Sequence, residues 1–201
     1  MKETEAEIAA AGVLCRSFRA DVSKPEELSG LAEMVWKEFG RVDLLVNNAA
    51  VFLPGAVDDV TPEVWDRTLD VNLKGPFFAA QAIGRRMREA GGGCIVNIAS
   101  QGSLQPFTRH IPYSVSKAGI VMLTRLLALA LAPSVRVNAV APGTIVVPGE
   151  EEGTPAKPAA DTIPLKRYGT PEDVAEAVIY LAKARYVTGV VLPVDGGATT
   201  G

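Results

Sequence analysis

Short apolar runs of strand length alternate along this sequence with longer segments of helical periodicity. The expected strands are 13–20, 42–48, 94–100, 135–140 and 190–197, and the expected helices are 23–39, 61–89, 113–131 and 170–183. Strands that alternate with helices of this length form a parallel sheet whose two faces are both covered by helices. The sequence therefore predicts an α/β fold built on a doubly wound parallel sheet.

Local signals mark where these helices begin and end. Ser23 and Glu26 have the spacing of a capping box, and Gly40 is typical of the residue that follows a helix. Thr61 followed by Pro62 predicts an N-cap and a first helical turn. The unbroken apolar run 42–48 predicts a strand that is covered on both faces.

Composition limits the classes of partner. The chain of 201 residues is long enough for one domain, 1–201, and its net charge of −3 offers no basic surface, so nucleic acid is not an expected partner. The longest apolar run, 118–132, is too short to span a membrane and contains Arg125. Cys15 and Cys94 match no metal-ligand spacing and suit a reducing compartment, so a cytoplasmic protein is expected.

The segment 144–169 departs from the alternation because it is rich in proline, glycine and charge. A connection of this length inside a domain is usually functional or disordered. It follows the carboxyl end of strand 135–140, and open α/β sheets bind ligands at such ends. We therefore expect a mobile substrate lid at 144–169, with a solvated loop as the alternative.

Tyr113 and Lys117 lie four residues apart at the start of the apolar helix 113–131, so they share one helix face. A free phenol has a pKa near ~10, too high for easy proton exchange at neutral pH. A neighbouring ammonium favours the phenolate and lowers that pKa, which suits general acid–base catalysis. Taken alone, the pair has an alternative interpretation, in which the tyrosine and lysine lie at the surface of a helix and have no function.

Polar and small residues end the predicted strands. Ser100 closes strand 94–100, the segment 47–50 (NNAA) closes strand 42–48, and 142–143 (PG) follows strand 135–140. Asn72 lies in a helical stretch where asparagine is disfavoured. A doubly wound sheet holds its ligand at such strand ends, so these residues form a candidate site with the tyrosine and lysine.

These motifs resemble those of the short-chain dehydrogenase/reductase family, in order from residue 13 to 197. The similar segments are NNAA (47–50), DVNLKG (70–75), IVNIAS (95–100), YSVSK (113–117), VNAVAPG (137–143) and VTGVVLPVDGG (187–197). The resemblance implies a Rossmann-like fold and an oxidoreductase that interconverts an alcohol and a carbonyl with NAD or NADP. It also implies a small-molecule substrate and a homotetramer or homodimer.

The resemblance also implies a role for each site residue. Tyr113 is expected to be the acid/base, Lys117 to lower its pKa and hold the nicotinamide ribose, and Ser100 to polarise the substrate oxygen. Asn72 is expected to anchor a water that relays protons from Lys117. The cofactor-binding residues implied by position, besides Tyr113 and Lys117, are Asp21, Val22, Asn48, Ala49, Ala50, Pro142, Gly143 and Ile145.

Two features depart from the family pattern. Its glycine-rich βαβ unit is missing: Gly12, Gly30 and Gly40 have no phosphate-loop spacing, so the first two strands are expected to be absent. Strand 13–20 would then either pair directly with strand 42–48 or leave two unpaired edges. Val147 also stands where the family has a threonine that hydrogen-bonds the carboxamide of the cofactor.

Two interpretations of the missing unit remain open. One is that the functional protein extends beyond Met1. The other is that the chain stands alone as a non-catalytic fragment or pseudoenzyme that acts through self-association or partner binding. His110 is equally open, since it could contact substrate or be an ordinary loop residue.

Overall fold

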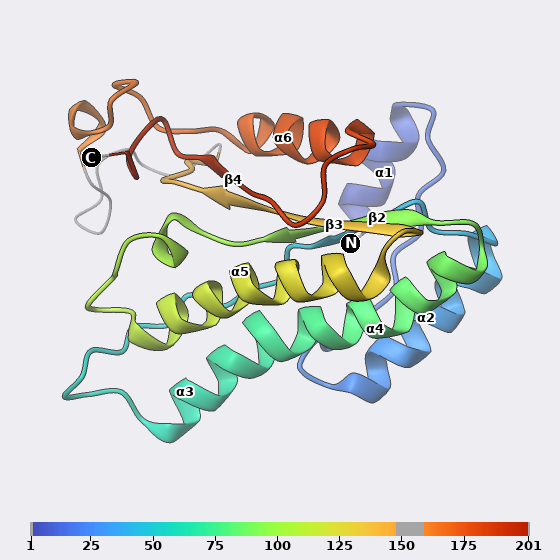
Figure 1. Ribbon diagram of the computed structural model, residues 1–201, viewed down its shortest axis with the longest axis horizontal. Coiled ribbons are helices and arrows are strands. Elements are labelled where there is room, and N and C mark those ends of the chain that lie inside the picture. The colour runs from blue at the N-terminus through green and yellow to red at the C-terminus, as the bar shows by residue number, and fades with distance from the viewer. Residues whose placement is uncertain (1, 148–158, 201) are drawn as a thin grey trace.

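The computed structural model describes residues 2–147 and 159–200, and these contain one parallel sheet of four strands (Figure 1). The strand order is β1-β2-β3-β4, the same as the chain order. The strands are β1 (Leu44–Asn47), β2 (Gly93–Ile98), β3 (Val135–Pro142) and β4 (Val191–Val194). All three neighbouring pairs are parallel, so every carboxyl end meets at one edge.

Helices lie on both faces of this sheet, as an α/β fold requires. The helices are α1 (Lys2–Ala10), α2 (Pro25–Phe39), α3 (Pro62–Leu69), α4 (Gly75–Glu89), α5 (Ile111–Leu131) and α6 (Pro171–Lys183). Helices α4 and α5 cover one face, with α2 against α4, and α6 covers the other (Figure 1). The expected Rossmann-like arrangement of helices on a parallel sheet is confirmed.

Two apolar clusters hold the layers together. On one face Met87 of α4 and Leu127 of α5 pack against Ile95 of β2. On the other face Leu181 of α6 packs against Val96 of the same strand. Because successive residues of a strand point to opposite faces, Ile95 and Val96 each belong to a different core. The sheet is therefore buried from both sides at β2.

One helical run extends from Pro62 to Glu89, where the sequence predicts a single interrupted helix. Residues Asp70–Lys74 form a π-helical turn between α3 and α4, in which the Gly75 N–H donates to the Asp70 carbonyl five residues earlier. Pro76 has no N–H to offer, so the ladder must change at this point. Such turns are frequent at functional sites, and this one carries the buried Asn72.

Two predictions about the first third of the chain are wrong. Residues 13–20 form no strand, because a strand needs a neighbour and the described residues provide none for this segment. The Ser23–Glu26 capping box does not form: Lys24 is the N-cap of α2 and has no side-chain cap. The Ser23 hydroxyl instead hydrogen-bonds the Asp21 carboxylate at 2.7 Å.

The cover expected on both faces of strand 42–48 is incomplete at Val46, and one edge of the strand also has no described strand beside it. Strand β1 pairs with β2 alone among the described residues, so its other edge is open. Val46 is 38% exposed. The sheet thus has an exposed apolar border next to the groove described below.

Helix α5 is longer than the apolar run that the sequence analysis measured. Its 21 residues are enough, by length and composition alone, to cross a membrane, and no other described helix meets that test. Core helices of globular proteins meet the same test, and α5 packs against β3 while burying Ser116 and Lys117. We therefore describe it as the central core helix of this face.

Gly75 offers a test of the π turn. A Cβ at this position would lie 2.6 Å from the Val22 carbonyl oxygen, and neither backbone can move away easily. We expect Gly75→Ala to lower the free energy of unfolding by about 1–3 kcal/mol. Gly30, in α2, has open space around its Cβ position, so Gly30→Ala should raise stability by about 0.5–1 kcal/mol. Urea unfolding measures both, and a fully stable Gly75→Ala protein would contradict this packing.

Candidate active site

Ser100 and Tyr113 meet at the carboxyl end of the sheet. Ser100 follows β2, is 7% exposed, and accepts a hydrogen bond from the Gly102 N–H at 3.0 Å. Tyr113 lies in the first turn of α5, and a hydrogen bond with Ser100 acts on its phenol. The 3₁₀ turn at 101–103 and the loop after it bring the two hydroxyls together, as the sequence analysis expected.

Lys117 lies one turn further along α5 and is almost completely buried. Its side chain is 3% exposed, and its ammonium nitrogen Nζ donates to the Ile98 carbonyl at 2.7 Å. The same nitrogen lies 5.8 Å from the centre of the Tyr113 ring. Burial lowers the pKa of Lys117 to about 8, because the charged form loses its hydration.

The pKa of Tyr113 is a correction to the sequence analysis. The structure raises this pKa above its usual value, because burial disfavours the phenolate, while the hydrogen bond with Ser100 acts in the opposite direction. The spacing of the two residues predicts the opposite, a pKa lowered by the Lys117 ammonium. With a pKa of about 8, Lys117 has already lost its proton at the pH where the buried phenol titrates, so it does not stabilise the phenolate.

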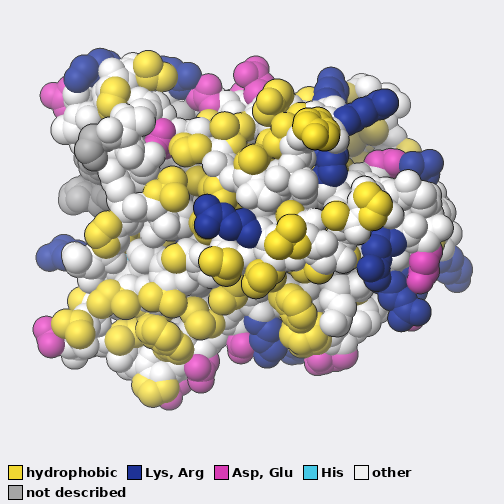
Figure 2. All heavy atoms as spheres, viewed as in Figure 1, with side chains coloured by type: hydrophobic (Ala, Val, Ile, Leu, Met, Phe, Trp, Pro, Cys, Tyr) yellow, Lys and Arg dark blue, Asp and Glu magenta, His cyan; other side chains and the backbone are white. Residues whose placement is uncertain are grey.

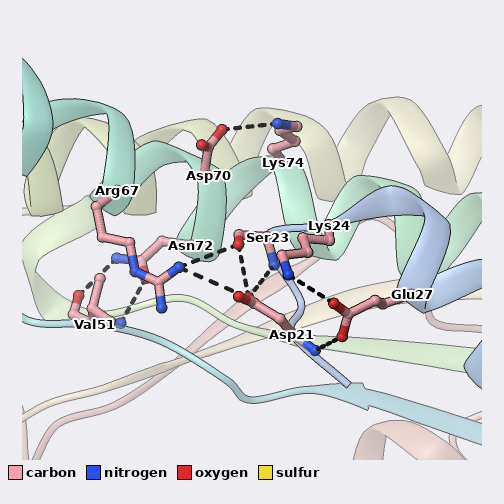
Figure 3. Close-up of polar contacts among 9 residues, drawn as sticks. All are labelled: Asp21, Ser23, Lys24, Glu27, Val51, Arg67, Asp70, Asn72 and Lys74. Atoms are coloured by element: carbon pink, nitrogen blue, oxygen red, sulfur yellow. Dashed lines mark hydrogen bonds and ion pairs between the residues drawn. The ribbon is translucent and has the colours of Figure 1, made fainter.

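Asn72 ties the loop after β1 to the π turn. Its Oδ1 accepts from the Val51 N–H at 2.8 Å, and its Nδ2 donates to the Val51 carbonyl at 2.9 Å (Figure 3). Nδ2 also donates to Ser116 Oγ at 3.1 Å. Both amide protons are therefore used, and one lone pair of Oδ1 remains for a water. The proton relay from Lys117 through Asn72 stays a prediction.

Four of the residues assigned to the cofactor lie around the outer edge of β1. Val22, Asn48 and Ala49 line a groove of about 140 Å³ between α2, α4 and this strand. Ala50 continues the same exposed turn. The lining of the groove is mainly apolar, and Asn47 and Asn48 at the carboxyl end of β1 belong to it.

Asp21 stands at the near end of this groove in a network of charges. Its carboxylate accepts from the Ser23 N–H and hydroxyl, and the Arg67 guanidinium of α3 lies 3.8 Å away (Figure 3). These hydrogen bonds, with Ser23 first, lower the pKa of Asp21. Its backbone N–H is held in turn by the Glu27 carboxylate at 2.7 Å.

The remaining assigned residues lie beyond β3. Pro142 ends that strand, and the Gly143 N–H donates to the Val194 carbonyl at 2.9 Å. A Cβ on Gly143 would lie 2.7 Å from the Asp195 Cα, so β3 and the end of β4 require a glycine here. Ile145 forms a parallel bridge with Gly169, which joins the two ends of the predicted lid. Residues 148–158 of that lid lie outside the described residues.

Asn97, Thr124 and Phe52 near this site were not predicted from the sequence, whereas Asn47 lies in the predicted NNAA segment. Asn47 donates to Asn97 at 2.8 Å, and Asn97 donates to Thr124 at 2.9 Å, a buried chain of amides under the strand ends. Asparagines inside apolar strands were the available signal. Phe52 was also missed, and its contacts with Tyr113 and with His110 have no signature in a single sequence.

Comparison with known proteins assigns the family. The family model described as enoyl-(acyl carrier protein) reductase matches residues 1–199. An NAD-dependent glycerol dehydrogenase of Listeria innocua is 38% identical over 189 residues, which make up 91% of this chain and 74% of the relative. A 3beta-hydroxysteroid dehydrogenase 1 of Eggerthella lenta is 40% identical over 206 residues, 98% of this chain and 79% of the relative. The chain belongs to the short-chain dehydrogenase/reductase family.

A solved structure supports the same assignment. A blue fluorescent protein from a metagenomic library, in complex with NADPH, has a TM-score of 0.88 at 33% identity, over 98% of this chain and 81% of that one. The short-chain dehydrogenase/reductase assignment agrees with the meeting of Ser100, Tyr113 and Lys117 at the strand ends. It does not favour the alternative of a non-catalytic fragment.

The nicotinamide end of a dinucleotide fits the described residues. The Lys117 ammonium has three N–H donors, and one of them is used by the Ile98 carbonyl. The other two remain for the hydroxyls of a sugar bound close to Tyr113. Gly143 keeps the strand end free of a side chain.

The buried lysine makes stability depend on pH. The pKa of Lys117 is about 8 in the folded protein and 10.5 when unperturbed. Between these values the folded protein has released a proton that the unfolded chain still holds, so raising the pH favours folding. Lys117→Met removes this titration and keeps most of the volume. We expect the wild type to gain about 1–3 kcal/mol on the variant from pH 8 to pH 10.5.

Denaturant unfolding of both proteins across this pH range measures the difference. Other groups titrate equally in the two proteins, so only the gap between their curves matters. A constant gap would show that Lys117 keeps an ordinary pKa in the folded state.

Proposed function

We propose that this protein catalyses the NAD(P)-dependent interconversion of an alcohol and a carbonyl, with Tyr113 as the acid/base. The observation that carries the proposal is the buried contact of the Tyr113 phenol with Ser100, next to the desolvated Lys117. Membership of the family supports an oxidoreductase, and the relatives include an NAD-dependent dehydrogenase.

Ser100 and Tyr113 take different roles in the proposed reaction. In the direction of reduction, Ser100 and Tyr113 both donate hydrogen bonds to the carbonyl oxygen and stabilise the negative charge that develops there. Tyr113 then transfers its proton to that oxygen, and in oxidation it accepts one. A bound nicotinamide supplies or accepts the hydride, which is chemistry of the cofactor rather than of the protein.

The pKa values fit the direction of reduction. Burial keeps the Tyr113 phenol protonated, so it is ready to act as an acid toward a carbonyl. Lys117, with a pKa of about 8, is charged at neutral pH and can hydrogen-bond the ribose hydroxyls that we assign to it. The cofactor contacts of Asp21, Val22 and the 48–50 turn, and those of Pro142, Gly143 and Ile145, belong to the same proposal.

Two finer points of the family pattern are also proposals. The first is that residues 1–201 lack the glycine-rich unit and the first two strands of the family sheet. The open edge of β1 and the unpaired segment 13–20 support it. The second is that 144–169 covers the substrate, which is supported by the bridge between Ile145 and Gly169 at its two ends.

Self-association is proposed for the outer face of α4 and α5. Figure 2 shows hydrophobic side chains gathered over the helices of this face. Met122, Leu126 and Leu129 of α5 are 52%, 57% and 81% exposed. We propose a homodimer or homotetramer through these helices, which light scattering can measure. A small-molecule substrate and a cytoplasmic location belong to the same proposal. The free thiols of Cys15 and Cys94 support the location, and the net charge of −3 offers no basic surface for nucleic acid.

Replacing the phenolic hydroxyl tests the proposed function. Tyr113→Phe keeps the ring and its packing but removes the proton donor, so kcat should fall by a factor of roughly 10²–10⁴. Tyr186→Phe, at a fully exposed tyrosine, is the matched control and should be unaffected. Turnover is followed by NADH or NADPH absorbance with a panel of ketones.

Titration of each protein with NADH and NADPH separates chemistry from cofactor binding. Equal affinity in wild type and Tyr113→Phe, with turnover lost in the variant alone, supports the acid/base role. Retained turnover in Tyr113→Phe contradicts it. Tight binding of either dinucleotide to residues 1–201 would show that the glycine-rich turn is not required.

A further inference from the structure

An aromatic trio stands at the reacting end of the site, and two of its members have no part in the function proposed above. The Phe52 and His110 rings are stacked, with centroids 3.9 Å apart and an interplanar angle of 16°. The Phe52 ring also meets the Tyr113 ring edge-on, at 4.6 Å and 84°. Phe52 therefore contacts the side chain that we assign as proton donor.

The loop that carries Phe52 is fixed on both sides of this residue. Before it, both backbone groups of Val51 are held by the Asn72 side chain. After it, the Gly55 N–H donates to the Arg109 carbonyl at 2.9 Å and the Gly55 carbonyl accepts from the Ile111 N–H at 2.9 Å. The position of the Phe52 ring is thus set by the same elements that position Tyr113.

His110 supports the ring from behind. Its Nδ1 lies 3.0 Å from the Leu53 carbonyl oxygen. A carbonyl can only accept, so Nδ1 must carry a proton and the orientation of the imidazole is fixed. The imidazole plane lies nearly parallel to the Phe52 ring and covers one of its two faces.

More than half of the Phe52 side chain remains open to solvent. Phe52 is 55% exposed although it lies against the partly buried Tyr113. A large apolar ring in such a place loses free energy to water until another apolar group covers it. Rings prefer offset-stacked or edge-on partners, so a flat group bound beside the Tyr113 hydroxyl would meet the surface that Phe52 presents.

We propose that Phe52, backed by His110, determines substrate specificity by binding a flat hydrocarbon ring attached next to the reacting carbon. This inference rests on the proposed oxidoreductase function and names the substrate class for that site. Family membership does not decide the matter, because the relatives are named for a substrate as small as glycerol and for a hydroxysteroid. His110 acts through Phe52 and is a positioning residue.

A pair of ketones that differ only in the ring tests the proposal. Acetophenone carries a phenyl group where acetone carries a methyl group, and both present the same carbonyl to Tyr113. We expect Phe52→Leu to lower the ratio of kcat/KM for acetophenone over acetone by roughly 3- to 10-fold. Phe52→Tyr keeps the ring and should keep the ratio. Phe39→Leu, at an exposed phenylalanine at the end of α2, is the matched control and should leave it unchanged.

His110 is tested by the same ratio. His110→Ala removes the backing ring and should lower the ratio, whereas His110→Phe restores a flat ring and should recover most of it. A purely structural role would lower kcat/KM for both ketones equally in His110→Ala and leave the ratio unchanged. That result would contradict the positioning role.

Ligand binding without turnover separates this inference from the proposed function. Saturation-transfer difference NMR with 1-phenylethanol and 2-butanol needs neither reaction nor hydride. We expect strong signals from the phenyl protons with wild type, Tyr113→Phe and Phe39→Leu, and signals several-fold weaker with Phe52→Leu. If 1-phenylethanol binds no better than 2-butanol, or if Phe52→Leu binds it as well as wild type, the inference is wrong. If the phenyl group binds through Phe52 but Tyr113→Phe retains turnover, the proposed function fails and the ring site stands.

Discussion

The burial of one ammonium group organises the functional end of this protein. Lys117 is held between α5 and the carboxyl end of β2, and the Ile98 carbonyl is its one hydrogen-bond partner among the described residues. A buried charge with a single neutral partner is costly, and the protein relieves part of that cost by lowering the pKa to about 8. The ammonium nitrogen lies 5.8 Å from the centre of the Tyr113 ring. Burial of Lys117 therefore lowers the free energy of unfolding, while the same buried group serves the proposed reaction. Such a conflict is common at sites that bind a ligand.

The π turn at 70–74 links this centre to the loop after β1. The wider turn stands just before Pro76, which has no N–H for a regular helix, and it contains the buried Asn72. Asn72 then fixes Val51, and Val51 fixes the start of the loop that carries Phe52. The close approach of Gly75 to the Val22 carbonyl extends the same arrangement to the segment that begins α2. The loop after β1, the segment that begins α2 and, through Ser116, helix α5 thus all contact this irregular turn.

Much of this architecture follows from local patterns. Helices at 25–39, 62–89, 111–131 and 171–183 and strands at 44–47, 93–98, 135–142 and 191–194 lie where periodicity and the Gly40 and Thr61 signals indicate them. The meeting of Ser100 with Tyr113 follows from the rule that parallel strands expose their carboxyl ends at one edge.

The failures share a cause, since each depends on what surrounds a residue in space. Segment 13–20 has the composition of a strand, but no described strand lies beside it. The Ser23 hydroxyl hydrogen-bonds the Asp21 carboxylate instead of capping α2. The Tyr113 pKa moves upward because burial, which spacing does not reveal, outweighs the opposing hydrogen bond with Ser100. The Phe52 and His110 stack brings together residues 58 positions apart, which no window of a single sequence can show.

The free border of β1 has a consequence for handling the protein in solution. Its backbone amides and carbonyls on that side have no strand beside them among the described residues, and Val46 adds an apolar side chain to the same border. Such a border is a template onto which any extended polypeptide can add by main-chain hydrogen bonds, whatever its sequence. Samples of residues 1–201 should accordingly grow in particle size as they are concentrated, and a short capping peptide of strand-forming sequence should reverse that growth.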